Sequence, residues 1–431
     1  MLSAKFLVAL LAAPGAFGAT NWIVPGAAWY DTAGKKIDAH GGGIVKRGNT
    51  FYWLGQSVSN NIAPQMYSST DLLNWENLGV QASITQLWRP KYAKPNGEYW
   101  IFGQQDRYAD SLVSSSLVGG YTQHAKVYLP PSSYSYSDTG MFYDDSTETW
   151  YLLTSADHNV VQVNAINSDG SVGTRASHSQ SSAGAYEAPG MFKAGGVYFL
   201  IVSGKTGWRA NPNKVFTASS INGPWSGGSD IAPENENTYN SQNTFELTVS
   251  GSQATTYIYM GDEWDSSGGA SSNYTWLPMS VNTGAKTVTL QYYSMWKVDP
   301  NTGVVSTPSS SAKYPASVAS VSGRAAISTR SIVSLSPGDE ITFSNVTATG
   351  GTQWVKLLYD VRNREDGEVH LFVNNEPKAT NIAALNSRAG YALEVPVALK
   401  LNEGSENTVT LSATGREGFA VQVKGIEVVE N

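Results

Sequence analysis

A pattern of two short strands recurs five times across residues 20–303, and it limits the folds that this chain can adopt. Each copy starts with a polar or aromatic residue, followed by a short run with Gly or Pro, a turn, and a second run rich in Tyr, Phe and Trp. The copies start at His40, Trp88, Asp138, Glu187 and Gln242, at spacings of 48, 50, 49 and 55 residues. Supersecondary units repeated at such a period are typical of β-propellers. Because the segment shows almost no helical periodicity, we predict an all-β chain that begins with a five-bladed β-propeller.

The first residue of each copy is expected to face the axis of the propeller. The first strand of every blade runs beside that axis, so equivalent strand starts converge around one pit. The predicted ring contains two carboxylates, Asp138 and Glu187. Paired carboxylates are the apparatus of glycoside hydrolysis, in which inverting enzymes hold them roughly 6.5–9.5 Å apart. Partial burial beside Tyr186 and Pro189 is expected to raise the pKa of Glu187, which suits a general acid.

Each ring residue also has an ordinary structural interpretation. Glu187 can be a turn glutamate that caps backbone amides, and Asp138, in the stretch SDTG, can be a turn aspartate. His40 and Gln242 can be polar residues bonded to the backbone, and Trp88 can belong to the core. The 13 Trp and 23 Tyr of the chain fit β-rich packing as well as a surface on which rings stack against sugars.

The composition changes after Val304. Residues 304–313 carry the Ser/Pro-rich stretch STPSSSAK, which we interpret as a linker. Residues 314–431 contain alternating apolar and polar runs separated by turn residues, and this pattern predicts a β-sandwich.

The N-terminal segment predicts export. Residues 1–19 combine Lys5, an apolar run and small residues near the end, which is the layout of a secretory signal peptide. No later stretch approaches the roughly 20 apolar residues of a membrane helix, so we expect a secreted, extracellular protein without a membrane partner. The chain has no Cys and therefore no disulfides. The sequons at Asn273 and Asn345 fit a glycoprotein.

Charge and composition restrict the partner. The formal net charge is −7, only 15% of residues are charged, and no basic cluster occurs, which argues against nucleic acid. A neutral polysaccharide or oligosaccharide fits better. We expect a monomer that needs no cofactor.

Several strings along the chain carry a family resemblance. AHGGGI with YWLG, then RPK, YEAPGMF and GWRANPNK, and finally SQN with YMGDEW resemble glycoside hydrolase family 43, and within it the fungal exo-β-1,3-galactanases. In that group a propeller precedes a carbohydrate-binding module of family 35. The resemblance implies an exo-acting, inverting hydrolase that releases galactose from β-1,3-galactan in arabinogalactan side chains.

The resemblance also implies catalytic roles. Glu187 matches the general acid, and Asp138 matches the carboxylate that positions the sugar and adjusts the pKa of the acid. His40 stands where most of the family has its aspartate base, and the galactanase group similarly lacks that base. Gln242 matches the glutamine that holds the attacking water in the galactanase group, with its imidic acid tautomer as one option because an amide is a very poor base.

The predicted substrate contacts include two departures from the family. The contacts are His40, Gln56, Trp88, Tyr108 and Trp208. Gln56 and Trp88 stand where the family has glutamates, and a lost charged hydrogen bond is worth about 1.5–3 kcal/mol. We therefore expect a remodelled sugar subsite. The alternative function is a catalytically weakened or re-specialised member that binds or cleaves another plant cell-wall glycan.

The C-terminal domain departs from the family 35 module as well. The calcium-binding YEAE motif of that module reads Tyr314-Pro-Ala-Ser317 here, and Lys424 lies near a usual ligand aspartate. Because carboxylates are the usual ligands of calcium, we expect no metal site in the sandwich. Sugar binding by this domain stays open.

Overall fold

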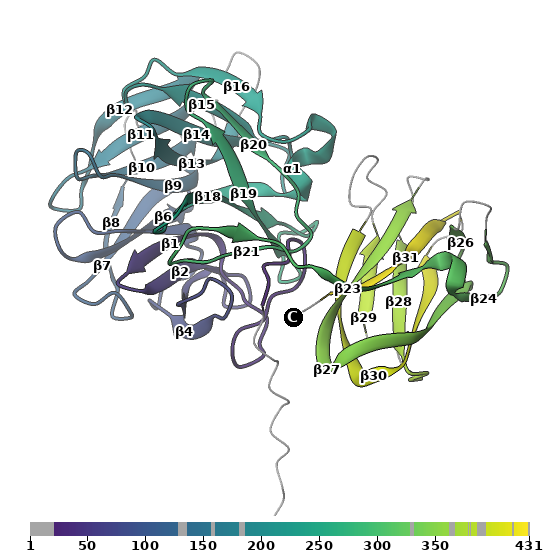
Figure 1. Ribbon diagram of the computed structural model, residues 1–431. Coiled ribbons are helices and arrows are strands. Elements are labelled where there is room, and N and C mark those ends of the chain that lie inside the picture. The colour runs from purple at the N-terminus through teal and green to yellow at the C-terminus, as the bar shows by residue number, and fades with distance from the viewer. Residues whose placement is uncertain are drawn as a thin grey trace, which may run out of the picture.

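The computed structural model describes residues 21–127, 136–156, 160–180, 186–327, 332–361, 367–377, 379, 381–385, 394–415 and 418–429. Two β domains lie side by side in it, the first coloured purple to green and the second green to yellow (Figure 1). The predicted signal peptide lies outside the described residues. Among the described helices, none is both long enough and apolar enough to cross a membrane.

Five four-stranded antiparallel sheets form the first domain, which confirms the predicted propeller. Blade I contains β1 (His40–Arg47), β2 (Thr50–Ser57), β3 (Ala63–Ser69) and β4 (Glu76–Val80). Blade II contains β5 (Trp88–Ala93), β6 (Tyr99–Gln105), β7 (Tyr108–Ser114) and β8 (Thr122–Val127). Blade III contains β9 (Tyr136–Asp144), β10 (Thr149–Ala156), β11 (Val160–Ile166) and β12 (Val172–Gln180). Blade IV contains β13 (Tyr186–Ala194), β14 (Val197–Gly204), β15 (Lys214–Ala218) and β16 (Ser226–Asp230).

Blade V follows two short helical turns, η1 (Glu234–Glu236) and α1 (Asn237–Asn240). It contains β17 (Gln242–Ser250), β18 (Thr255–Glu263), β19 (Asn273–Asn282) and β20 (Thr287–Leu290). The inner strands β1, β5, β9, β13 and β17 contact one another in this order, and β17 contacts β1 to close the circle. Ile23 and Trp296 exchange two backbone hydrogen bonds of 2.7 and 3.0 Å, which fasten the start of the propeller to its end.

All five inner strands carry a register shift within their first five residues. In three of them the second or third residue adopts the left-handed region: Gly41 (φ 59°), Arg89 (φ 49°) and Ala188 (φ 53°). Such bulges bend a strand and re-aim its side chains, and they are frequent next to active sites. A left-handed Arg or Ala is strained, so the surrounding sheet must hold these two residues in place.

Much of the aromatic content belongs to the propeller core. Five Trp side chains are 1% exposed or less, namely Trp53, Trp75, Trp100, Trp276 and Trp296. Trp53 makes edge-to-face contacts with Trp75 and Trp276, at centroid distances of 5.3 and 4.8 Å. For these residues the packing interpretation of the sequence is therefore confirmed.

The second domain is a two-layer β-sandwich, as predicted. Its strands are β23 (Ser310–Pro315), β24 (Ser320–Ser322), β25 (Ala326–Ile327), β26 (Val333–Leu335), β27 (Glu340–Val361), β28 (Gly367–Val373), β29 (Asn381–Leu385), β30 (Glu394–Gly415) and β31 (Val421–Val429), with η2 (Ala316–Val318) after β23. The long strands β27 and β30 pair with each other along both halves. One half of this pair extends through β24, β28 and β29, and the other half through β31, β23 and β26. Buried Val, Leu and Ile side chains from both layers fill the space between them.

The two domains meet through an apolar cluster. Trp22, Val24 and Met295 of the propeller pack against Val429 of the sandwich, with Trp354 beside them. Between the domains, the segment interpreted as a linker contains β22 (Val305–Ser306), which pairs with β21 (Lys297–Val298), and the start of β23. The domain boundaries themselves stay predictions.

Candidate active site

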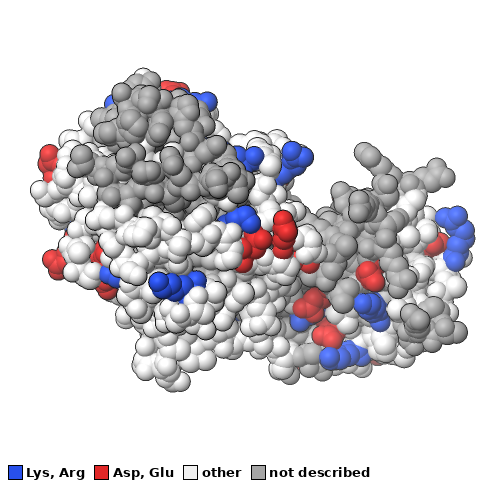
Figure 2. All heavy atoms as spheres, turned by 90° about the horizontal axis from the view of Figure 1, so that it is seen from above, with Lys and Arg blue, Asp and Glu red and all other residues white. Residues whose placement is uncertain are grey.

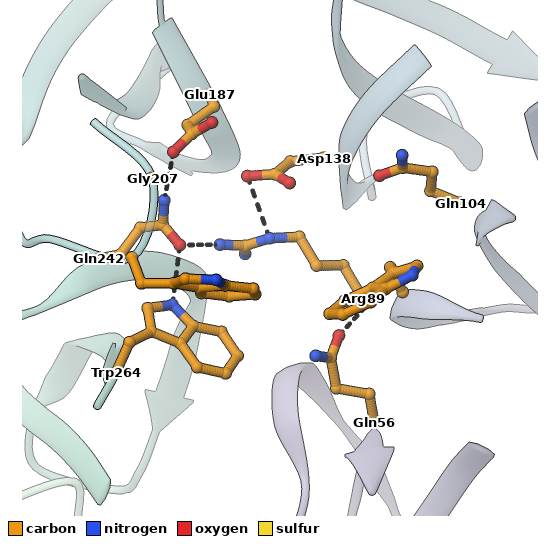
Figure 3. A pocket seen from close by; sticks show the side chains of 10 residues that line it. Gln56, Arg89, Gln104, Asp138, Glu187, Gly207, Gln242 and Trp264 are labelled. Atoms are coloured by element: carbon orange, nitrogen blue, oxygen red, sulfur yellow. Dashed lines mark hydrogen bonds and ion pairs between the residues drawn. The ribbon is translucent and has the colours of Figure 1, made fainter. Parts of the chain in front are cut away.

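A pocket of about 270 Å³ opens where the inner strands of the propeller begin. Every blade contributes to its wall, as Figure 3 shows for the labelled side chains. The lining residues are Gln56, Trp88, Arg89, Gln104, Asp138, Glu187, Gly207, Trp208, Gln242 and Trp264. The five-fold repeat of the sequence thus brings residues from distant segments to one site.

Most of the predicted site residues line this pocket. Those that do are Gln56, Trp88, Asp138, Glu187, Trp208 and Gln242. Those that the sequence analysis missed are Arg89, Gln104, Gly207 and Trp264. The sequence carries a signal for two of these missed residues, because Arg89 follows Trp88 in the RPK string and Trp264 ends YMGDEW.

His40 does not line the pocket and is only 1% exposed. Its ring stacks on Tyr274 at 4.6 Å and lies 5.2 Å from the ring of Trp264. His40 Nδ1 lies 3.1 Å from Asp262 Oδ1. Burial by itself would raise the pKa of Asp262, but the hydrogen bond and charge of His40, assisted by Arg89, hold it below its usual value. His40 therefore lies behind the pocket-lining ring of Trp264, where the ionised carboxylate of Asp262 fixes it.

Tyr108 is also absent from the pocket lining. It begins β7, pairs with Gln105, and has the ammonium group of Lys126 5.0 Å from its ring centre. The structure therefore does not bring Tyr108 together with the other candidate residues.

Glu187 and Gln242 are in direct contact. The amide Nε2 of Gln242 donates to Glu187 Oε1 at 2.7 Å (Figure 3). On its other side, Gln242 Oε1 accepts hydrogen bonds from Arg89 Nη2 at 2.5 Å and from Trp264 Nε1 at 2.9 Å. Guanidinium and indole groups have no acceptor, so the amide oxygen must face them and the amide nitrogen must face Glu187.

Glu187 has the protonation behaviour of a general acid. Burial, followed by the negative charge of Asp138, raises its pKa to about 8. The charges of Arg89 and Lys205 and the hydrogen bond from Gln242 oppose this rise only in part. The carboxyl group therefore keeps its proton at neutral pH and can give it to a leaving oxygen.

Asp138 holds the backbone and the charge of the site in place. Its Oδ2 accepts from Arg89 Nε at 3.1 Å and from the backbone N–H of Ala188 at 3.0 Å. The second bond ties Asp138 to the strained residue that follows Glu187. Asp138 is therefore anchored to the inner strand of the next blade. Its interpretation as a simple turn aspartate did not include this long-range bond.

Three indole rings line part of the pocket. The ring of Trp208 lies 6.0 Å from that of Trp88 and 5.0 Å from that of Trp264. Gly268 allows this arrangement, since a Cβ atom at that position would lie 2.5 Å from the Trp208 ring. The neutral amides of Gln56 and Gln104 complete the lining. Apolar ring faces combined with amides suit a neutral, hydroxyl-rich ligand.

A buried lysine ties the inner strands together next to the site. Lys91 is 0% exposed, and its ammonium group donates to the backbone carbonyls of Gly41 at 2.5 Å and Thr139 at 3.2 Å. Burial, followed by the charge of Arg89, lowers the pKa of Lys91 well below its usual value.

Among the described residues, no group of three or more His, Asp or Glu side chains is placed to hold a metal ion. The absence of a calcium site in the sandwich stays a prediction.

Comparison with known proteins decides the family. Residues 38–272, more than half of the chain, match the model of glycosyl hydrolases family 43. The chain belongs to this family. It is a glycoside hydrolase, and the resemblance seen in its sequence is confirmed. A search of curated proteins found no match.

Among solved structures, this family 43 hydrolase is similar to an exo-β-1,3-galactanase from Phanerochaete chrysosporium in complex with galactose. The two share 32% sequence identity with a TM-score of 0.80, over 95% of this chain and 100% of that chain. A second structure of that enzyme contains β-1,3-galactotriose. The exo-β-1,3-galactanase from Clostridium thermocellum shares 23% identity with a TM-score of 0.62, over 95% of this chain and 100% of that chain, which shows a common fold. The family 35 assignment of the sandwich stays a prediction.

Proposed function

We propose that this family 43 hydrolase is exo-acting, releases galactose from β-1,3-galactan with inversion, and works outside the cell as a monomer. The observation that carries the proposal is the contact between a protonated Glu187 and a fixed Gln242 inside an indole-lined pocket. The galactanases of similar structure support the choice of substrate. The signal-peptide pattern of residues 1–19 supports export.

In this mechanism Glu187 gives its proton to the glycosidic oxygen as the bond from that oxygen to the anomeric carbon breaks. A water molecule adds to the opposite face of the anomeric carbon and loses one proton. Glu187 is left ionised and regains a proton before the next cycle. General acid catalysis of this kind typically contributes about 10²–10⁴-fold to the rate.

The bonds that hold Asp138, the second carboxylate of the pocket, favour inversion. Asp138 is held by Arg89 and by the Ala188 amide through its Oδ2 atom. A retaining enzyme needs a carboxylate that can form a bond to the sugar, roughly 5–5.5 Å from the acid. An anchored Asp138 and a neutral Gln242 do not offer such a nucleophile, so direct attack by water is the simpler route.

A re-specialised hydrolase is the second candidate, and two side chains favour it. Trp88 and Gln56 replace the family glutamates and both line the pocket. Gln56 Oε1 is occupied by the backbone N–H of Arg89 at 2.8 Å, whereas its Nε2 is buried without a partner among the described residues. An indole and an amide donor select for a different arrangement of hydroxyl groups than two carboxylates do.

A product profile tests the proposal against this second candidate. The secreted enzyme is incubated with β-1,3-galactan, arabinan and xylan, with the Glu187→Gln variant as the inactive control. The proposal expects free galactose from β-1,3-galactan alone, released progressively from chain ends. Sugar release only from arabinan or xylan would establish the re-specialised function instead.

A further inference from the structure

The Gln242 amide is held by a side chain that is itself rigid. Arg89 is 4% exposed, and its guanidinium group bonds to Asp138 Oδ2 and to the carbonyl oxygen of Asn243, each at 3.1 Å. Its own carbonyl oxygen accepts from Thr139 Oγ1 at 2.7 Å. Blades III and V thus fix the position from which Arg89 donates to Gln242 (Figure 3).

Trp264 is fixed in the same way. Its ring packs between His40 and Trp208, at centroid distances of 5.2 and 5.0 Å. From this position the indole N–H points at Gln242 Oε1, 2.9 Å away. The amide oxygen therefore receives two hydrogen bonds from groups that cannot turn around and accept one.

This arrangement restricts the chemistry of Gln242. With both lone pairs of its oxygen occupied, the amide can serve other groups only through its two N–H bonds. An imidic acid tautomer would carry an O–H at this oxygen, and neither Arg89 nor Trp264 could accept that hydrogen. The tautomer that the family resemblance leaves as an option has no place for its proton here.

We propose that Arg89 and Trp264 are positioning residues that hold the Gln242 amide with its nitrogen toward the pocket, so that Gln242 serves the attacking water as a hydrogen-bond donor and not as a base. The inference rests on the proposed function. One N–H of Gln242 is bonded to Glu187. An inverting reaction needs roughly 6.5–9.5 Å between the acid and the group that holds water. Because Gln242 is fixed, it is Glu187 that turns away when the sugar enters, and the N–H of Gln242 that Glu187 releases then faces the water.

The proton that the water loses passes to bulk water, from which Glu187 is reprotonated.

A double-mutant cycle tests this role. Trp264→Phe removes the indole N–H and keeps an aromatic ring, so Gln242 loses one of the two donors that orient it. We expect kcat on β-1,3-galactobiose to fall about five- to tenfold, the effect of one hydrogen bond. If the amide oxygen can then turn toward Glu187, it accepts a hydrogen bond from the carboxyl O–H, which stabilises the protonated form, and the basic limb of the pH profile moves to higher pH. In a Gln242→Ala background, Trp264→Phe should leave the pH profile in place and lower kcat by clearly less than in the wild-type background, because no amide remains to be positioned.

Controls separate the possible outcomes. Trp100→Phe removes a comparable indole hydrogen bond, 3.0 Å to Asn96 Oδ1, outside the pocket, and should lower stability without moving the pH profile.

Equal losses of kcat from Trp264→Phe in both backgrounds would mean that the indole acts on the sugar directly. This result would overturn the inference while leaving the proposed function intact. A wild-type protein that does not cleave β-1,3-galactobiose would overturn both. Arg89→Lys should show a larger loss with the same dependence on Gln242, and if this buried substitution prevents folding, the Trp264→Phe cycle alone decides.

Discussion

At the scale of single residues, the proposed activity depends on a carboxyl group that keeps its proton. Glu187 is placed by a bulge, partly buried, and faced by Asp138 and Gln242. Glu187→Gln keeps the shape and the hydrogen bonds of this side chain but cannot protonate a leaving group. We expect hydrolysis of unactivated β-1,3-galactan to fall by about 10²–10⁴-fold, with an unchanged melting temperature or a higher one. A variant with near-wild-type activity would show that another residue is the acid.

The pH dependence follows from the same group. The proposed mechanism needs protonated Glu187, so activity should disappear as the pH rises through its pKa of about 8. The negative charge of Asp138 contributes to that high pKa, so Asp138→Asn should lower it and move the basic limb of kcat/KM to lower pH. Initial rates measured from pH 4 to pH 10 decide this. A basic limb that stays in place in Asp138→Asn would mean that burial alone sets the pKa.

The sequence predicts the centre of this site better than its periphery. A spacing argument selects one residue per blade, and it found Asp138, Glu187 and Gln242. It could not find Arg89, because only the bulge in β5 brings two consecutive residues, Trp88 and Arg89, to the pocket. It also placed His40 in the pocket, since the buried carboxylate that holds His40 back, Asp262, lies 222 residues away in sequence. Such a long-range partner leaves no local signal.

At the scale of secondary structure elements, the bulges of the inner strands connect backbone conformation to the site. Gly41 adopts φ 59° in the bulge of β1, and a Cβ atom there would lie 2.9 Å from Arg89 Cγ and 3.0 Å from Gln56 Oε1. Gly48 has the same φ of 59°, but a Cβ atom would meet nothing within 4 Å. The two glycines therefore form a matched pair in which only one lies against the site.

Alanine substitutions at this pair isolate the contact. Gly48→Ala should cost about 1–2 kcal/mol of stability, the strain of a left-handed residue, and leave kcat unchanged. Gly41→Ala carries the same strain and also displaces Arg89, so we expect kcat to fall at least tenfold as Gln242 loses its fixed donor. Chemical denaturation and steady-state kinetics give both quantities. Equal kinetics in the two variants would show that the bulge does not position Arg89.

Element order and fold class were predictable because they depend on short-range patterns. The period of about 50 residues fixes the number of blades, and the alternation in residues 314–431 fixes the sandwich. The long strands β27 and β30 were not predicted as single elements, because residues such as Gly350 and Gly351 interrupt the pattern and read as turns. The structure instead continues β27 through these glycines with positive φ.

At the scale of the whole molecule, the surface fits a neutral partner. On the face in Figure 2 basic and acidic side chains are scattered over both domains, and most of the described surface there is uncharged. Among the described residues, the cluster of Trp22, Val24, Met295 and Val429 joins propeller to sandwich. The sandwich is thereby held next to the propeller that carries the pocket (Figure 1).

The two sequons differ in their surroundings. Asn273 Nδ2 donates to the carbonyl oxygen of Gly26 at 3.1 Å, and Thr275 is 1% exposed. Asn345 and Thr347 are both exposed on β27. When the protein is secreted from a yeast host, we expect a glycan on Asn345 and none on Asn273. Peptide mapping by mass spectrometry, with Asn345→Gln as the control, checks this, and full occupancy of Asn273 in the folded protein would contradict the packing described here.

The anomeric form of the first product tests the central claim most directly. Wild-type enzyme is mixed with β-1,3-galactotriose, and the earliest free galactose is followed by proton NMR before mutarotation equalises the anomers. Acid catalysis by Glu187 with direct attack of water predicts α-galactose, released one unit at a time to leave galactobiose first. Initial release of β-galactose would require a covalent intermediate on a second carboxylate, and would contradict the assignment of Asp138 and Gln242 made here.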